Sequence, residues 1–331
     1  MTRGRSLLLL VALLSVSLTQ MPFSSAGRAA AQEPARDQEK ATRPESQGPS
    51  ARPMTIPIGI RVRGGKPEFE IRTLDLNVNE DGEPQTILYI RPVSTTSPIT
   101  IQILFQDDLV NTAANEIKPL AEFIRQLPKG SRVMVAYVRS GTLDVRQKFT
   151  QDLEKAANAL RIPMGLASAA PYNPYVEVLE ALKRFDSQPS GRRAMLLVSD
   201  GLDLSRGIDS SSPAQSLDLQ RAIGQAQKRS VAIYSFFVPS VTLNNLNNQA
   251  LTANAQGSLQ RLSDETGGKA LFQGTSAPVS FDPFLRDLGE SLDRQVALTY
   301  LSTHPRKGFH KIQIRSLTPG VDISYPAGYS N

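Results

Sequence analysis

Two stretches of continuous apolar residues are the clearest elements in this chain. Residues 99–105 and 194–199 each predict one buried strand, and acidic residues follow both: Asp107 and Asp108 after the first, and Asp200 after the second. A continuous apolar strand bounded by polar turn residues is typical of a parallel sheet that helices cover on both faces. Because ligand sites in such sheets lie at the carboxyl ends of the strands, we expect function at this edge.

Helical periodicity and short apolar runs alternate along residues 98–293, which predicts an α/β fold with a mostly parallel sheet. The predicted helices cover residues 112–127, 151–161, 173–186, 213–228, 255–265 and 282–293. The predicted strands cover residues 99–105, 132–139, 143–148, 194–199, 230–237 and 269–272.

Both flanks of this region are expected to form strands, and alternation of apolar and polar residues in the first flank predicts that its strands are half-buried. The first flank is 54–97, where Asp81-Gly82 between two alternating runs indicates a hairpin. The second flank is 294–331. Neither segment is long enough to bury its apolar face alone, so we expect the two to pack together as one small β unit.

Residues 1–31 have the pattern of a secretory signal peptide. Two arginines precede the apolar run 7–18, which is too short to span a membrane. We expect cleavage after Ala31 or, as the alternative, after Ala26, followed by secretion or residence in the periplasm. Residues 32–53 hold four prolines, four acidic and four basic side chains and no large apolar residue. They are therefore predicted to be a disordered linker.

Four segments, taken in order along the chain, resemble von Willebrand factor type A (vWA) domains, in particular secreted bacterial proteins of unassigned function. They are the hairpin at 76–85, the Ser-Asp-Gly strand end at 199–203, the Thr-Gly-Gly turn within 262–272 and the closing β segment 295–329. The resemblance implies a doubly wound sheet with one antiparallel edge strand, which we assign to 143–148. It also implies binding rather than catalysis.

The resemblance further implies where a metal would bind and which ligands this chain lacks. Adhesion-type vWA domains hold Mg2+ with an Asp-x-Ser-x-Ser loop, a Thr and a further Asp, all of which supply oxygen atoms. Here the first loop aligns as residues 107–111, with the alkyl side chain of Leu109 in place of an oxygen ligand. The Thr position falls on Tyr172 or Asn173. The metal-ion-dependent adhesion site is therefore predicted to be degenerate.

We accordingly expect no bound metal and no other cofactor. If Mg2+ did bind, Asp107, Asp200 and the amide of Asn111 would be its ligands. Without a metal, Asp107 and Asp200 would lie together as like charges, and at least one of their pKa values is expected to rise.

The predicted function is an exported, non-enzymatic module that binds a protein partner of the cell envelope or the extracellular space. Its surface would be the carboxyl rim, including segment 239–254, which is interpreted as a binding loop or, alternatively, as a packing insertion. Metal-dependent adhesion and a hydrolase built on the clustered carboxylates stay as alternatives. The predicted rim residues are Asp107, Asp108, Asn111, Tyr172, Asn173, Asp200, Asp203, Asn244, Asn245 and Leu246.

Composition and the absence of certain motifs argue against several other classes of function. The chain has no cysteine and no tryptophan, and its formal charge of +6 falls to +3 when Arg3, Arg5 and Arg28 leave with the signal peptide. This mild, scattered excess does not favour nucleic-acid binding. Loops for phosphate binding and serine-nucleophile motifs are absent from the sequence. The two histidines, His304 and His310, are interpreted as solvent-facing strand residues.

Overall fold

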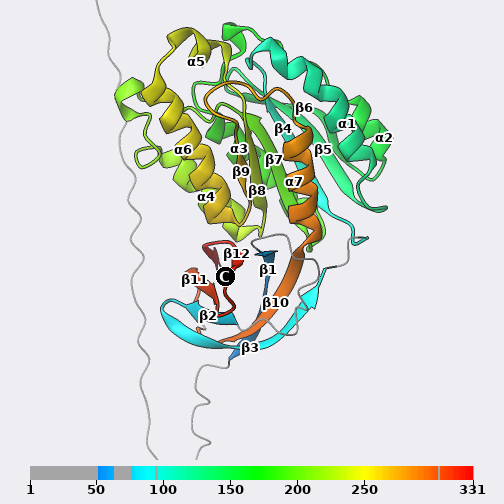
Figure 1. Cartoon of the computed structure of the whole chain (residues 1–331), viewed down its shortest axis with the longest axis vertical. Helices are drawn as coiled ribbons and strands as arrows, with labels where there is room; N and C mark the ends of the chain where they lie inside the picture. Colours follow the sequence, from blue (N-terminus) through cyan, green and yellow to red (C-terminus); the bar gives the residue numbers. More distant parts are fainter. Residues whose placement is uncertain (1–50, 63–75, 94–95, 305, 331) are drawn as a thin grey trace, which may run out of the picture. The chain divides into compact units, whose positions relative to one another are not determined.

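The computed structural model describes residues 51–62, 76–93, 96–304 and 306–330 (Figure 1). The predicted signal peptide and most of the predicted linker lie outside these residues. The linker prediction is wrong at its end, because strand β1 (Arg52–Val62) already includes Arg52 and Pro53. The main chain there pairs with a distant strand, and composition alone does not reveal such pairing.

A six-stranded sheet forms the centre of the α/β region, with strand order β6-β5-β4-β7-β8-β9. Neighbouring strands are parallel except for β5 and β6, which are antiparallel. Within this region the order is 3-2-1-4-5-6, that of a doubly wound sheet, and the α/β prediction is confirmed. The strands are β4 (Thr100–Gln106), β5 (Arg132–Arg139), β6 (Thr142–Thr150), β7 (Arg193–Ser199), β8 (Ala232–Phe237) and β9 (Ala270–Leu271).

Seven α-helices connect these strands in the described part of the chain, together with short 3-10 turns. They are α1 (Ile117–Arg125), α2 (Leu153–Asn158), α3 (Pro174–Lys183), α4 (Leu217–Lys228), α5 (Val241–Leu246), α6 (Gln249–Thr266) and α7 (Asp282–Asp293). The predicted start of α4 at residue 213 is wrong, because the Ser216 hydroxyl accepts the amide of Leu219 and fixes the helix start there.

The segment 239–254 is also not the open loop that was predicted. Ser240 caps α5, and Asn248 caps α6 by accepting the amides of Ala250 and Leu251. Asn248 of this segment is thus a helix cap, since Ser and Asn satisfy the free amides of a first helical turn. The predicted rim residues Asn244 and Asn245 are exposed.

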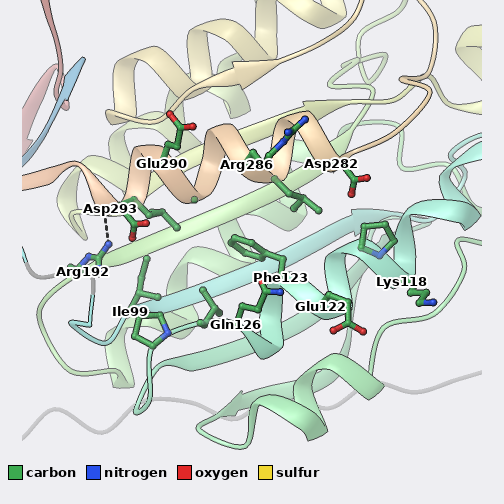
Figure 2. Close-up of a pocket in the computed structure, with 16 residues that line it drawn as sticks. Ile99, Lys118, Glu122, Phe123, Gln126, Arg192, Asp282, Arg286, Glu290 and Asp293 are labelled. Atoms are coloured by element: carbon green, nitrogen blue, oxygen red, sulfur yellow. Dashed lines mark hydrogen bonds between the residues drawn. The ribbon is translucent and has the colours of Figure 1, made fainter. Parts of the chain in front are cut away.

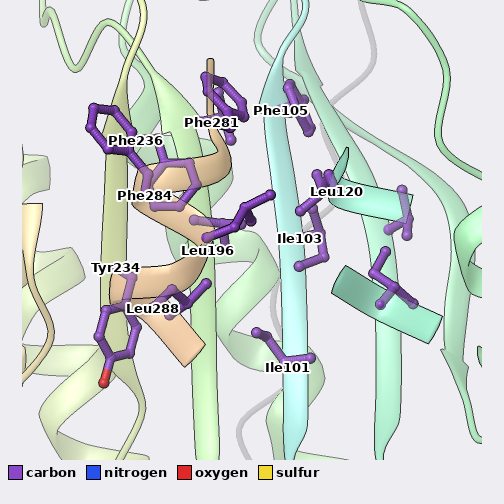
Figure 3. Close-up of a cluster of buried hydrophobic side chains, with 14 of the residues drawn as sticks. Ile101, Ile103, Phe105, Leu120, Leu196, Tyr234, Phe236, Phe281, Phe284 and Leu288 are labelled. Atoms are coloured by element: carbon purple, nitrogen blue, oxygen red, sulfur yellow. The ribbon is translucent and has the colours of Figure 1, made fainter. Parts of the chain in front are cut away.

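Helices cover both faces of this sheet. Ile101, Ile103 and Phe105 of β4 face the layer of α1, α2 and α7, whereas Leu104 faces the layer of α3, α4 and α6. The first layer contains an aromatic cluster in which Phe236 lies 5.3 Å from both Phe281 and Phe284, measured between ring centroids (Figure 3). Edge-to-face pairs of this kind add about 1 kcal/mol each to the area that they bury.

The remaining strands form a seven-stranded antiparallel sheet, with order β12-β1-β10-β3-β2-β11-β13. Strands from the two flanks of the chain interleave in it, as the predicted packing of the two segments requires: β1 lies between β12 and β10, and the pair β3-β2 lies between β10 and β11. The turn at Asp81-Gly82, with φ of 51° and 90°, joins β2 and β3 as predicted. The other strands are β2 (Leu76–Glu80), β3 (Glu83–Pro92), β10 (Gln295–Ser302), β11 (Phe309–Ser316), β12 (Val321–Ser324) and β13 (Gly328–Ser330).

The Thr-Gly-Gly turn at the end of α6 has a specific steric cause. Gly267 adopts the left-handed conformation, with φ of 82°, and the amide of Gly268 returns to the carbonyl of Ser263. A Cβ atom on Gly268 would lie 2.0 Å from the carbonyl oxygen of Ile233 in β8. The second glycine therefore lets the chain pass directly beside the sheet.

Gly268→Ala is expected to lower the free energy of unfolding by about 2 to 3 kcal/mol, because the backbone of β8 has to move to make room. Gly224→Ala is the matched control: Gly224 is inside α4 and has nothing within 4 Å of its missing Cβ, so this change is expected to stabilise by up to about 1 kcal/mol. Urea unfolding of both variants measures the difference. Equal effects would contradict the close approach.

Candidate functional site

The carboxyl edge of the six-stranded sheet holds a buried ion pair. Asp107 follows β4 directly, and its side chain is fully buried. Arg161 binds it with two parallel hydrogen bonds, Nη1 to Oδ1 at 2.6 Å and Nη2 to Oδ2 at 2.8 Å. The amide of Met164 donates to the same Oδ1 at 3.0 Å. Such a bidentate, charge-assisted pair is both strong and geometrically specific.

Two further contacts fix the guanidinium of Arg161. It lies over the ring of Tyr137, 3.9 Å from the centroid, and the Tyr137 hydroxyl bonds both the amide and the carbonyl of Arg161. The hydrogen bonds to Asp107 raise the pKa of this guanidinium above its usual value. Arg161 thus supplies a permanent internal cation to the first carboxylate of the edge.

Sequence reasoning missed Arg161. The predicted helix 151–161 would have placed it in a last helical turn, but α2 ends at Asn158 and the chain bends back toward the sheet edge. A short helix followed by Arg-Ile-Pro, in which proline stops helix continuation, was the available signal.

Asp108 and Asp200 form a second, differently stabilised pair. They are 1% and 4% exposed. Gln106 donates to Oδ1 of Asp108 at 2.8 Å, while Oδ2 has no partner among the described residues. Burial, followed by the charge of Asp200, raises the pKa of Asp108 to about 7. Asp107 and Asp200 were expected to lie together as like charges, with a raised pKa for at least one of them. The pKa of Asp200 is raised, but by burial, because Arg161 compensates the charge of Asp107. The charge of Asp200 acts instead on Asp108.

Two other predicted rim residues are structural. Asn173 caps α3 by accepting the amide of Tyr175, and its side-chain amide donates to Asp218. Asp203 accepts hydrogen bonds from Ser205 and from the Ser216 hydroxyl, and these bonds hold the loop after β7. Both side chains are buried, so neither contributes to an exposed binding surface. Their prediction as exposed rim residues is therefore wrong.

The remaining predicted rim residues are exposed. Tyr172 is 78% exposed, and Leu246 is 45% exposed beside the exposed Asn244 and Asn245 of α5. Asn111 is exposed in the first loop. Five of the ten predicted residues therefore lie on the surface of the edge, whereas the four acids and Asn173 lie beneath it.

The structure adds large apolar side chains that the sequence prediction left out. Ile162, Met164 and Leu166 are 57%, 40% and 50% exposed, and Ile208 is 51% exposed. Together with Tyr172 and Leu246, these side chains form what we call the apolar rim: Ile162, Met164, Leu166, Tyr172, Ile208 and Leu246.

Main-chain hydrogen bonds connect the loops that carry the apolar rim. The amide of Gly165 donates to the carbonyl of Asp107 at 3.0 Å, and that of Val241 donates to the carbonyl of Asp108 at 2.9 Å. The amide of Leu204 donates to the carbonyl of Tyr172 at 2.8 Å. These bonds place the loops after β4, α2, β7 and β8 at one edge of the sheet.

The geometry offers little to a metal ion. Leu109 is fully buried and forms an isolated bridge with Ser240, so its position supplies no oxygen ligand. In the part of the chain that the structure describes, no group of three or more His, Cys, Asp or Glu side chains is arranged to hold a metal. Asp107 and Asp200 would be the metal-binding carboxylates, and Arg161 already occupies the first of them.

A cleft of about 940 Å³ lies away from these residues, between α1 and α7 (Figure 2). Phe123 and Leu285 contribute apolar surface to it, and Arg192 lies at its inner end. Arg192 donates to the carbonyls of Ser97 and Leu292, so its guanidinium is held by the protein itself. None of the predicted site residues lines this cleft.

Comparison with known proteins gives fold likeness only. No family model and no curated protein matches this sequence. Similar solved structures include an aerotolerance-related membrane protein from Bacteroides fragilis, with 11% identity, 60% of this chain and 99% of that chain covered, and a TM-score of 0.39. Another is a conserved hypothetical protein, BatB from Bacteroides thetaiotaomicron, with 11% identity, 59% of this chain and 97% of that chain covered, and a TM-score of 0.39.

A von Willebrand factor type A protein from Catenulispora acidiphila is also similar, with 11% identity, 80% of this chain and 76% of that chain covered, and a TM-score of 0.39. TM-scores this low carry no argument about the fold. The description of the α/β region as vWA-like therefore rests on its strand order and on the sequence motifs of this chain. Among the helices of the described residues, none is both long and apolar enough to cross a membrane.

Arg161→Met is expected to lower the free energy of unfolding by about 2 to 4 kcal/mol, because it leaves the buried Asp107 with only the more distant guanidinium of Arg139, 4.0 Å away. Adding Asp107→Asn should recover part of this loss. Arg221→Met is the control: its ion pair with Asp218 is exposed, so removal is expected to cost less than about 1 kcal/mol. Urea unfolding of the four proteins tests this order, and a loss for Arg161→Met no larger than the control would refute it.

Asp108→Asn is expected to stabilise the protein in a defined pH window. The native carboxyl keeps its proton up to about pH 7, whereas the usual pKa is 3.8. The native state therefore binds more protons in that window, and wild-type stability falls as the pH rises through it. The variant should gain at most about 4 kcal/mol near pH 7, from about 1.4 kcal/mol per pKa unit.

Below about pH 4 the gain of Asp108→Asn should disappear, since both proteins are then uncharged at this position. The exposed Asp209 provides the matched control, and the stability change of Asp209→Asn is subtracted from that of Asp108→Asn at each pH. Thermal unfolding across this pH range measures both variants. A gain that is constant with pH would show that Asp108 is ionised in the native protein.

Proposed function

We propose that the chain is an exported, non-enzymatic interaction module that binds a protein partner through the apolar rim, without a metal ion. The observation that carries this proposal is the gathering of exposed apolar side chains on loops that are tied together at one sheet edge. Singly exposed apolar residues are common on protein surfaces, but a contiguous patch with polar neighbours is typical of an interaction site.

Metal independence is proposed from the ion pair between Arg161 and Asp107. A divalent cation would have to displace a bidentate guanidinium and would then find an alkyl group at Leu109. Mg2+ sheds its water reluctantly and requires several oxygen ligands, so this exchange is unfavourable. The metal-dependent adhesion alternative would require that exchange to occur.

A hydrolase built on the carboxylates is the other alternative. The raised pKa of Asp108 suits a general acid, but a catalytic group has to reach its substrate. Asp108 is 1% exposed and Asp200 is 4% exposed, beneath the loops of the edge. Burial of both carboxyl groups therefore favours binding over catalysis.

The proposal predicts that a double change on the apolar rim, Met164→Asp with Tyr172→Asp, abolishes partner capture while the fold stays intact. The mature chain would be crosslinked to envelope and culture-medium proteins, with the captured partner identified and then tested as a purified protein. Leu317→Asp is the matched control, because Leu317 is 59% exposed in the turn between β11 and β12, strands of the other sheet. Each charge placed in an apolar contact should weaken binding at least about tenfold.

The same purified pair would be measured in millimolar Mg2+ and in EDTA, with equal affinity and an unchanged melting temperature expected. Binding that requires Mg2+ and disappears in Asp107→Ala would support the adhesion alternative. Turnover of a hydrolysable substrate that disappears in Asp108→Asn would support the hydrolase. Binding that survives the double change but not Leu317→Asp would move the site to the other sheet.

A further inference from the structure

The two histidines of the chain lie side by side where the β10–β11 connection meets β11, and His310 is not the solvent-facing residue that the sequence suggested. His310 of β11 is 4% exposed. His304 precedes it on the connection between β10 and β11, with 5.8 Å between the two ring centroids. The prediction is wrong for His310, which lies on the same face of β11 as the buried Ile312 and Ile314.

Both ring nitrogens of His310 contact groups that can only accept hydrogen bonds. Nδ1 lies 2.8 Å from Oδ2 of Asp81, and Nε2 lies 2.8 Å from the carbonyl oxygen of Arg306. A neutral imidazole carries one N–H and donates one hydrogen bond, whereas the imidazolium donates two. The geometry therefore favours the doubly protonated, positively charged ring.

The groups around His310 are mostly acidic. Glu80 at the end of β2 is fully buried, and its Oε1 lies 3.6 Å from Nδ1 of His310. Oε2 of Glu80 has no partner among the described residues, so the positive ring beside it offsets part of the cost of burying that carboxylate. Asp81 also accepts the amide of Lys311, which fixes the β2–β3 turn to β11.

The C-terminal strand closes over this cluster. Tyr329 of β13 pairs with His310 across the ladder, and the two rings lie 5.3 Å apart. Its hydroxyl donates to Oε1 of Glu80 at 2.6 Å, as the hydroxyl of Ser302 does at 3.0 Å. Because β13 has only three residues, these side-chain contacts hold much of it in place.

We propose that His310 is a protonation-dependent clasp: its imidazolium holds the β2–β3 turn, the β10–β11 connection and the strand β13 together, and loss of one proton loosens β13. The other titratable groups that face the ring are Glu80 and Asp81 from the β2 side, His304 from the connection and Tyr329 from β13, with Tyr300 of β10 beyond Glu80. The connection also contributes the carbonyl oxygen of Arg306. Lys311, next on β11, is exposed.

The direction of the switch follows from linkage. Burial alone would lower the pKa of His310, but the hydrogen bond to the Arg306 carbonyl, the hydrogen bond to Asp81 and the charges of Asp81 and Glu80 outweigh it and raise the pKa above 6.5. Stability from this group is fully present below the unfolded pKa and is lost as the pH rises through the folded one. The clasp is therefore closed in acid and opens on the alkaline side.

The test uses the untagged protein with isotope-labelled histidine, titrated by NMR between about pH 5 and about pH 9. His304→Gln assigns the two resonances, since it leaves a single histidine. We expect His310 to titrate with a midpoint above 6.5, with both ring nitrogens protonated below it, and we expect Asp81→Asn to lower that midpoint.

Hydrogen exchange, corrected for the intrinsic pH dependence, then reports the clasp itself. Amides of β13 and of 306–311 should lose protection about tenfold per pH unit beyond the His310 midpoint, whereas six-stranded-sheet amides stay unchanged. In His310→Gln, which donates only from its amide end, β13 should be weakly protected at every pH. If that variant does not fold, the wild-type titration still decides.

Two results would overturn the proposal. One is a His310 midpoint at or below 6.5, which would mean that the ring is not held as an imidazolium. The other is constant protection of β13 across a titration of His310 that is itself observed, which would mean that the ring and the strand are not coupled.

Discussion

Burial of carboxylates at the carboxyl edge is the constraint that organises this part of the molecule. The strand ends deliver Asp107, Asp108, Asp200 and Asp203 to one place, and an unpaired buried charge costs several kcal/mol. Each acid meets this cost in a different way. Asp107 has a guanidinium, Asp108 holds a proton, Asp200 accepts a main-chain amide and Asp203 accepts hydroxyl groups.

These solutions also shape the surface above the acids. The bend that brings Arg161 to Asp107 carries the next residues, Ile162 to Leu166, over the edge, and the amides of Met164 and Gly165 attach them there. A loop that is fixed before it meets a partner loses less conformational entropy on binding. The internal cation and the exposed apolar side chains are thus parts of one local structure.

The strands could be predicted from the sequence because a buried strand identifies itself by its own apolar residues. The run 99–105 became β4, and 194–199 became β7, each within one residue. Helix starts were harder, because a cap such as Ser216 or Asn248 resembles any other polar loop residue until its amide partners are known. Composition could not show that the predicted linker enters β1, because main-chain pairing with a remote strand decides that.

The candidate site likewise has a part that the sequence predicts and a part that it does not. The positions of the acids followed from the strands, but their partners are set by tertiary contacts, as between Asp107 and Arg161, which lie 54 residues apart. The burial of His310 could also have been predicted from the sequence. His310, Ile312 and Ile314 alternate along β11, and this period-2 pattern predicts that the histidine shares their buried face.

The pairing of β1 with β10 bears on how the chain folds. Thr55 faces Thr299 across this ladder, with their hydroxyls 2.8 Å apart and 244 residues between them in sequence. Closing so long a loop is entropically costly and slow, whereas neighbouring strands of the six-stranded sheet are joined by much shorter connections. During synthesis the α/β region can therefore begin to fold while β1, β2 and β3 still await their partners. Completion of the seven-stranded sheet has to follow the synthesis of β10, β11, β12 and β13.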